Sequence, residues 1–190
     1  MANQKICVFC ASKEGNDESF LNVANELGAK IAQKGFGLIY GGAQVGLMGQ
    51  VADAALENHG EVIGVIPESL ADREIAHPGV SSLIVTTDMH ERKRQMYDLA
   101  DAFIALPGGM GTLEEVFEAA TWTKLGMHRN GAYKPVVLLD YGEFWQDMIR
   151  FLDSQVSAGF VSKESREIVR NADTVDQAIE LAVKFPQSNE

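Results

Sequence analysis

The sequence predicts an α/β fold: a single-domain, Rossmann-like parallel sheet with helices on both faces. Three observations predict it. Short apolar runs alternate with stretches of helical periodicity from one end of the chain to the other. The runs are apolar throughout, which is typical of parallel strands buried on both faces. The chain has 190 residues and no internal repeat, low-complexity tract or linker, which suits one domain.

Each element follows from its own pattern. The apolar runs predict strands at residues 5–11, 37–40, 62–66, 83–87, 102–106 and 135–139, with a short strand near Ile168. Helical spacing predicts helices at residues 19–34, 47–58, 89–100, 112 to about 127, 144–155 and about 175–184. Pro67 ends the third strand, and we interpret the polar stretch from there through Pro78 as a connection.

Charge and hydropathy exclude several kinds of partner. The 16 Lys and Arg against 27 Asp and Glu give a net charge of −11, whereas DNA, RNA and anionic lipid select basic surfaces. The longest apolar run, residues 6–11, is far shorter than the roughly 20 residues of a membrane-spanning helix, and the N-terminus does not resemble a signal peptide. We therefore expect a cytoplasmic protein with no nucleic-acid or membrane partner.

Cys7 and Cys10 form a Cys-x-x-Cys, which could indicate a redox motif or half of a zinc site. Residues three apart in a strand point to opposite faces, and no second Cys/His pair supplies the remaining ligands. The four histidines have no metal-binding spacing either. We interpret the two thiols as buried structural groups and expect no metal site.

Three turns rich in small residues follow predicted strands, at residues 10–12, 41–43 and 107–112. Ligands of open parallel sheets bind beyond the carboxyl ends of the strands, so we expect these turns to converge on a site. The third turn, Pro-Gly-Gly-Met-Gly-Thr, leads into a helix whose exposed N–H groups and dipole suit a phosphate. Its spacing fits neither a P-loop nor the dinucleotide fingerprint, and a tight turn without a ligand is the alternative.

Two charged residues near this turn each have two interpretations. Arg92 falls on the apolar stripe of the helix at 89–100, where an arginine more often anchors a phosphate, carboxylate or purine than faces solvent. Glu115 could close a capping box with Thr112. A helical wheel instead places it opposite the expected core stripe, on a face shared with Ala119 and Trp122. A partner subunit is then its simplest cover. That core stripe is expected to consist of Leu113, Val116, Phe117 and Ala120.

Five segments together resemble the LONELY GUY (LOG) family. They are Phe-Cys-Ala-Ser at 9–12, Tyr-Gly-Gly-Ala at 40–43, Gly-Leu-Met-Gly at 46–49, Asp-Met-His-Glu-Arg-Lys at 88–93 and Pro-Gly-Gly-Met-Gly-Thr-Leu-Glu-Glu at 107–115. The resemblance runs from about residue 5 to 183. Members of the family are cytokinin riboside 5′-monophosphate phosphoribohydrolases, many of them mislabelled as lysine decarboxylases. They split the N-glycosidic bond of a nucleoside 5′-monophosphate into free base and ribose 5-phosphate.

The resemblance implies roles for individual residues. Arg92 and Glu115 would be the catalytic pair. The substrate-binding residues would be Ser12, Gly42, Glu74, Lys93, Gly108, Gly109, Met110, Gly111, Thr112, Glu114 and Thr121. Ala11 stands where glycine is common in the family and Met110 where plant members have tyrosine, which bears on the preferred base.

The resemblance also implies the wider properties of the protein. Residues 1–190 would form a single nucleotide-binding α/β domain with a short flexible tail from about 186. The substrate would be AMP or an N6-modified relative, the assembly a homodimer, and no metal or organic cofactor would be required.

Two other functions compete with this hypothesis. A non-catalytic binder of a phosphorylated ligand, like the molybdenum-cofactor carrier proteins, would share the sheet and the glycine turn. It would not need the Arg92 and Glu115 pair. A pyridoxal-dependent lysine decarboxylase is disfavoured, because such enzymes need a Schiff-base lysine in a larger fold.

Overall fold

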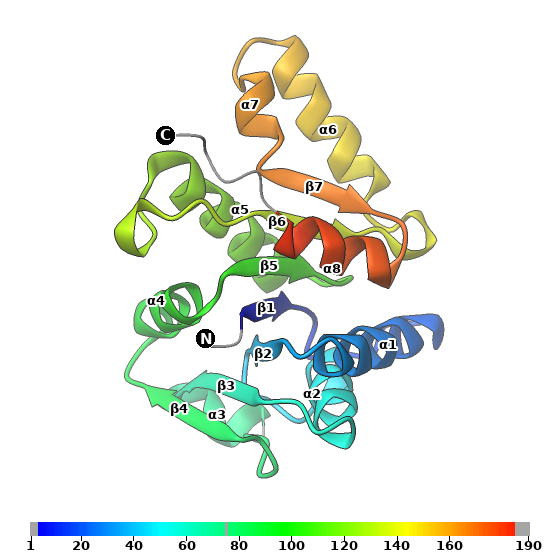
Figure 1. Cartoon of the computed structure of the whole chain (residues 1–190), viewed down its shortest axis with the longest axis vertical. Coiled ribbons are helices and arrows are strands. Elements are labelled where there is room, and N and C mark those ends of the chain that lie inside the picture. Colours follow the sequence, from blue (N-terminus) through cyan, green and yellow to red (C-terminus); the bar gives the residue numbers. More distant parts are fainter. Residues whose placement is uncertain (1–3, 75, 185–190) are drawn as a thin grey trace.

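The computed structural model describes residues 4–74 and 76–184 and confirms the predicted fold class. Seven parallel strands form one sheet in the order β4-β3-β2-β1-β5-β6-β7 (Figure 1). The strands are β1 (Lys5–Phe9), β2 (Gly37–Tyr40), β3 (Val62–Pro67), β4 (Ser82–Thr86), β5 (Ala102–Ala105), β6 (Val136–Leu139) and β7 (Val169–Ala172). The helices are α1 (Ser19–Gln33), α2 (Gly46–Glu57), α3 (Glu68–Glu74), α4 (Met89–Leu99), α5 (Met110–Leu125), α6 (Gln146–Ser157), α7 (Lys163–Arg166) and α8 (Val175–Val183). Two 3₁₀ turns, η1 (Arg129–Gly131) and η2 (Tyr141–Glu143), flank β6.

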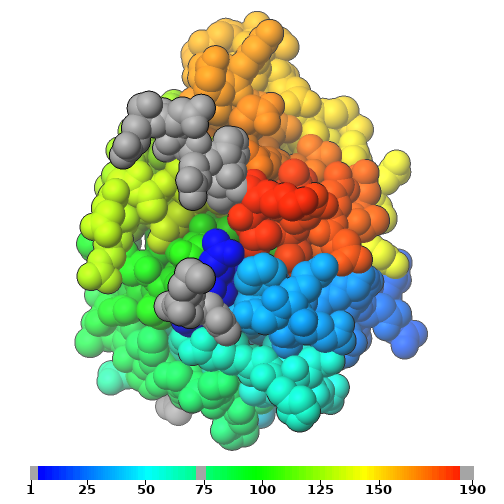
Figure 2. All heavy atoms as spheres, in the orientation of Figure 1, coloured from blue at the N-terminus to red at the C-terminus, as the bar shows by residue number. Residues whose placement is uncertain are grey.

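Helices cover both faces of the sheet. Alternate strand residues divide between two apolar layers, because successive side chains of a strand point to opposite faces. Ile6 and Val8 pack in the layer that contains α1, α2 and α8, whereas Cys7 and Phe9 pack with α4, α5 and α6. Figure 2 shows α8, α1 and α2 side by side over the first layer, in red, blue and cyan. The five inner strands are therefore buried on both faces, as their composition predicts, whereas the edge strand β4 exposes Leu83 and Val85, and β7 is partly exposed.

The order of the strands creates the crevice that holds the site. The chain builds outward from β1 through β2, β3 and β4, and then returns to place β5 on the other side of β1. The connections after β1 and β5 leave the sheet in opposite directions, and ligands of such sheets bind at this switch point. Residues 10–15 follow β1 and residues 106–109 follow β5, so both loops open there.

Some elements differ from the predicted ones. The stretch expected to be a polar connection contains α3, and α7 was not predicted; both are too short for a helical period to be recognised, and isolated helices of this length are unstable without tertiary contacts. The first strand ends at Phe9 rather than at residue 11. The tail predicted from about residue 186 lies outside the described residues.

Cys7 and Cys10 are both buried and unbonded, and they lie in opposite layers. The described residues contain no cluster of three side chains that could hold a metal ion. Over the same residues, no helix has both the length and the hydropathy needed to cross a membrane.

Candidate functional site

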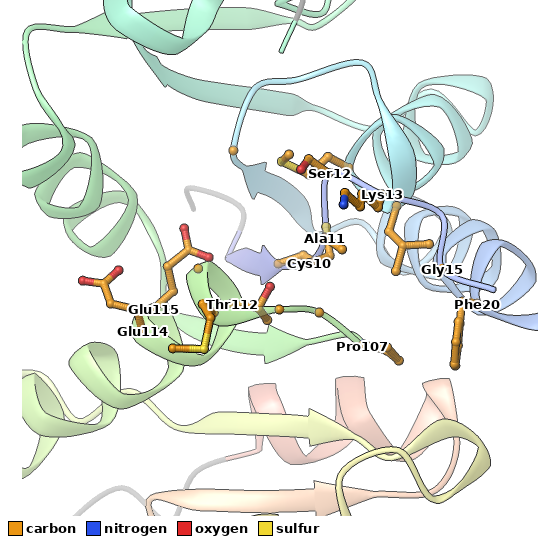
Figure 3. Close-up of a pocket in the computed structure, with 18 of the residues that line it drawn as sticks. Cys10, Ala11, Ser12, Lys13, Gly15, Phe20, Pro107, Thr112, Glu114 and Glu115 are labelled. Atoms are coloured by element: carbon orange, nitrogen blue, oxygen red, sulfur yellow. The ribbon is translucent and has the colours of Figure 1, made fainter. Parts of the chain in front are cut away.

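A cavity of about 510 Å³ lies at the switch point of the sheet. The loop after β1 forms one wall and the loop after β5 forms the facing wall, with α4 and α5 alongside. Figure 3 shows Ser12 and Lys13 on the first loop, Pro107 on the second and Thr112 at the start of α5, with Glu115 on one side of the view and Phe20 on the other. The predicted convergence of the small-residue turns is thus confirmed.

The start of α5 forms part of the cavity wall. Gly109 is the N-cap in an extended conformation, and the helix begins at Met110, two residues earlier than predicted. Thr112 therefore lies inside the first turn, which excludes the capping box with Glu115. The first N–H groups of a helix lack carbonyl partners within it, and together with the helix dipole they attract anions. Residues Gly109 to Thr112, which carry these groups, all line the cavity.

Gly108 is required by the conformation of this loop. A Cβ at Gly108 would lie 2.1 Å from Oγ1 and 2.6 Å from Cβ of Thr112. A Cβ at Gly109 or Gly111 would meet no protein atom within 4 Å. Gly108 thus makes room for Thr112, whereas Gly109 and Gly111 keep the cavity side of the loop open.

Arg92 is buried and lines the cavity. Its Nε donates to the main-chain oxygen of Val65 at 3.0 Å, and its Nη2 donates to that of Gly41 at 3.2 Å. Nη1 contacts Sδ of Met89 at 3.4 Å and lies 3.9 Å from Oε1 of Glu115. The main-chain oxygens of Val65 in β3 and of Gly41 just after β2 therefore fix the guanidinium, and Nη1 faces the carboxylate. The predicted burial of Arg92 on the apolar stripe of α4 is confirmed.

Glu115 is buried by its own chain, whereas the helical wheel of this helix placed it opposite the core. The buried residues of α5 are Thr112, Glu115, Val116, Ala119 and Thr123. Phe117, expected in the core, is 41% exposed. Apolar residues occur on every side of α5, so the sequence marks no single core face, and packing against the sheet and α4 decides it. The face shared by Glu115 and Ala119 does not need a partner subunit to cover it.

Lys93 lies next to Arg92 and is also buried. Its Nζ bonds to Glu114 and contacts Glu118 at 2.8 Å, and Glu118 accepts a hydrogen bond from the hydroxyl of Tyr97 at 2.8 Å. Burial alone would lower the pKa of Lys93, but the hydrogen bonds to Glu114 and Glu118 raise it. Lys93 therefore stays charged and holds two carboxylates beside the cavity.

Cys10 lies on the cavity wall as a neutral thiol. Burial raises its pKa, and the Glu115 carboxylate raises it further. A thiol in that state is a poor nucleophile, because the thiolate is the reactive form.

Ten of the thirteen residues that sequence reasoning nominated line this cavity. They are Ser12, Arg92, Lys93, Gly108, Gly109, Met110, Gly111, Thr112, Glu114 and Glu115. Gly41 lines the cavity in place of the expected Gly42. Thr121 lies outside it, exposed on α5, and its hydroxyl donates to the main-chain oxygen of Phe117 at 2.7 Å. Glu74 ends α3, and its side chain lies outside the described residues.

Sequence reasoning missed the apolar walls. Met48, Met89 and Met96 join Met110 at the cavity, and Phe20 and Phe144 lie at its edge with ring centroids 5.9 Å apart. Phe20 lies on the apolar stripe of α1, and Phe144 follows η2, far away in the sequence. Nothing local in the sequence marks either as a wall residue, because only the packing of the two segments brings them together.

Known proteins share this architecture and sequence. A family model described as possible lysine decarboxylase matches residues 48–182. The chain is 44% identical over 184 residues to the cytokinin riboside 5′-monophosphate phosphoribohydrolase LOG of Oryza sativa subsp. japonica, which covers 97% of this chain and 73% of that protein. This chain belongs to the LOG family. It is also 41% identical over 182 residues to the phosphoribohydrolase LOG2 of Arabidopsis thaliana, covering 96% of this chain and 84% of that one.

The LOG-family fold extends to solved structures of another class. The molybdenum cofactor carrier protein of Chlamydomonas reinhardtii superimposes with a TM-score of 0.70 and 29% identity over 94% of each chain. Its identity to this chain is well below that of the two LOG proteins. The family resemblance predicted from the motifs is therefore confirmed.

Proposed function

We propose that this LOG-family protein is an N-glycosidase that hydrolyses an adenine nucleoside 5′-monophosphate to free base and ribose 5-phosphate. The proposal includes AMP and N6-modified relatives, bound by one nucleotide-binding domain. The observation that carries it is the buried Arg92 and Glu115 pair, which shares a cavity with the open start of α5. A phosphate site alone would need no buried carboxylate, since a carboxylate repels phosphate.

The start of α5 would hold the 5′-phosphate. The N–H groups from Gly109 to Thr112 and the helix dipole supply the attraction, and the open Cβ positions of Gly109 and Gly111 allow close approach. These phosphate contacts would lie away from the N-glycosidic bond that breaks. Its binding energy can therefore position the ribose against Glu115.

Glu115 and Arg92 would act on the ribose. As the bond between C1′ and the base nitrogen breaks, its electron pair leaves with the base, and the sugar gains oxocarbenium character that a carboxylate stabilises. Water adds its oxygen to C1′ and loses one proton, which balances the proton that the departing base nitrogen takes up. Arg92 Nη1, 3.9 Å from Oε1 of Glu115, would orient the carboxylate toward the ribose.

The base would lie against apolar walls. Met48, Met89, Met110 and Leu70 line the cavity together with Phe20. Thioethers adapt to flat or branched apolar groups and contact aromatic rings favourably. Such walls suit a purine and accept an apolar N6 substituent.

A homodimer is part of the proposal, on a different surface from the one first expected. The outward face of α5 exposes Phe117 by 41% and Leu125 by 61%. Thr121, a substrate-binding residue by resemblance, lies on this same exposed side. A second copy covering the face would bury its apolar residues and give Thr121 a neighbour. We also place the protein in the cytoplasm, where the free thiols of Cys7 and Cys10 would remain reduced.

The test is chromatography of a panel of purine, pyrimidine and prenylated nucleoside monophosphates after incubation with the protein. We expect release of free base from AMP or an N6-modified relative. Glu115→Gln should lower kcat by about 100-fold or more, whereas Glu57→Gln, an exposed glutamate at the end of α2, should not. Full turnover by Glu115→Gln would remove Glu115 from the mechanism.

The structural likeness to the carrier protein keeps a second function in the test. A carrier would retain a phosphorylated ligand through purification and release no base from any nucleotide. That result would replace the hydrolase proposal with a binding one.

A further inference from the structure

We infer that Gly41 is a positioning residue for Arg92: it leaves the space that the guanidinium occupies and supplies the carbonyl that fixes it. The inference rests on the proposed function, because positioning has a purpose only if Arg92 acts on a substrate. It concerns the residue directly after β2, which the motif comparison left without a role.

The space beside Gly41 is filled by the guanidinium itself. A Cβ on Gly41 would lie 2.3 Å from Nη2 of Arg92 and 2.7 Å from Sδ of Met48. Separations below 3.0 Å essentially do not occur for real Cβ atoms. Any larger residue at position 41 would therefore displace the arginine, the methionine or both.

The carbonyl of Gly41 acts together with that of Val65. Nη2 donates to Gly41 at 3.2 Å and Nε donates to Val65 at 3.0 Å. One acceptor in β3 and one just after β2 hold a planar guanidinium in one orientation, because its N–H groups point in fixed directions. That orientation turns Nη1 toward Glu115.

The neighbouring Gly42 is a glycine for a different reason. Its φ of +81° lies in the left-handed region, and an added Cβ would meet Cβ of Ile66 at 3.1 Å and the amide nitrogen of Val65 at 3.2 Å. Gly41 is not in that region, so only the arginine and the methionine oppose a side chain there. Alanine at position 41 therefore tests the contacts with Arg92 and Met48, without the backbone strain that a side chain at Gly42 would bring.

The first experiment compares Gly41→Ala with Gly37→Ala at the start of the same strand. At Gly37 an added Cβ would meet only side-chain atoms, Cγ of Lys5 at 3.0 Å and Oε2 of Glu61 at 3.2 Å. We expect Gly41→Ala to lower kcat for AMP by about 100-fold, since small misplacements of catalytic groups cost that much. KM should change less than about 3-fold, because the phosphate site lies across the cavity on α5. Gly37→Ala should keep the kcat of the wild type.

A double-mutant cycle separates positioning from general damage. Arg92→Lys removes Nη2, so adding Gly41→Ala to it should lower kcat by less than about 3-fold further. A loss as large in this background as in the wild type would overturn the inference. So would recovery of kcat in Gly41→Ala combined with Met48→Ala, because the effect would then run through Met48.

Thermal unfolding of the same variants does not depend on activity. A drop in Tm for Gly41→Ala that shrinks in the Arg92→Lys background supports the contact, and equal drops overturn it. If the wild-type protein releases no base from any nucleotide, the proposed function fails, and this cycle alone decides whether Gly41 positions Arg92.

Discussion

Nη1 of Arg92 lies 3.9 Å from Oε1 of Glu115, and the two side chains are only 8% and 12% exposed. The opposite charges partly offset the cost of burying each other. Both side chains line the same cavity, so a ligand bound there would meet an arginine from α4 and a glutamate from α5. The predictions below follow from this pair and its surroundings.

Replacing Arg92 should impair catalysis more than binding. Arg92→Met keeps the volume of the side chain but removes the cation next to Glu115 and all donors to Gly41 and Val65. We expect kcat for AMP to fall by about 100-fold or more. Arg94→Met, an exposed neighbour on α4, is the matched control. A variant at position 92 that changed KM alone would make Arg92 a binding residue.

The phosphate loop should respond differently at two of its glycines. Gly108→Ala forces a Cβ against Thr112, so both Tm and the affinity for AMP should fall, with KM rising about 10-fold. The Cβ added by Gly111→Ala meets no protein atom within 4 Å, so the variant should have the Tm of the wild type. Its KM should rise only if the nucleotide approaches the backbone at this position. Unfolding scans alongside steady-state kinetics distinguish the two. Equal Tm losses would contradict this account of Gly108.

Replacing Lys93 should lower the stability of the protein. Lys93→Met removes the ammonium that holds Glu114 and Glu118 together and leaves two carboxylates close to each other. We expect unfolding in urea to show a loss of about 3 kcal/mol. Lys124→Met, an exposed lysine on α5, should lose less than about 0.5 kcal/mol. A Lys93→Met protein as stable as the control would contradict this prediction, because it would mean that hydration of the two carboxylates offsets the loss of the ammonium.

Stability should decrease as the pH falls below 6.5. Burial, assisted by the Lys134 ammonium, lowers the pKa of His128 from 6.5 to about 4. Between these values the unfolded chain binds a proton that the folded chain does not, so the free energy of unfolding falls with pH, by up to about 3 kcal/mol. Urea unfolding from pH 7.5 to pH 4 measures this slope. His128→Gln should flatten it, and an unchanged slope would assign the effect to other groups.

The oligomeric state should depend on the outward face of α5. Phe117→Arg places a charge on the exposed apolar surface and should shift a dimer toward monomer, as measured by analytical ultracentrifugation. Phe160→Arg removes an even more exposed phenylalanine beyond α6 and is the control. A wild-type particle of 20.7 kDa at micromolar concentration would rule out the dimer.

Much of this molecule could be predicted because its signals are local. Uniformly apolar runs mark the strands of a parallel sheet, and the strand-to-helix turn at residues 107–112 marks an anion site wherever the helix packs. The helical wheel mispredicted the core face of α5 because this helix has no purely polar side. Packing against the sheet and α4 buries Val116 and leaves Phe117 exposed, and the order of residues in the helix does not reveal this.

The sequence by itself determined the fold class, because uniformly apolar strands follow from short stretches of chain. Its motifs determined the family, and the resemblance to that family supplied ten residues that line the cavity. Only the tertiary structure decided that Glu115 is buried by its own chain, that Gly41 rather than Gly42 lines the cavity, and that methionines form its walls. These facts depend on atoms brought together from β2, β3, α4 and α5. Distances between segments so far apart in the sequence are set by packing, which no local pattern encodes.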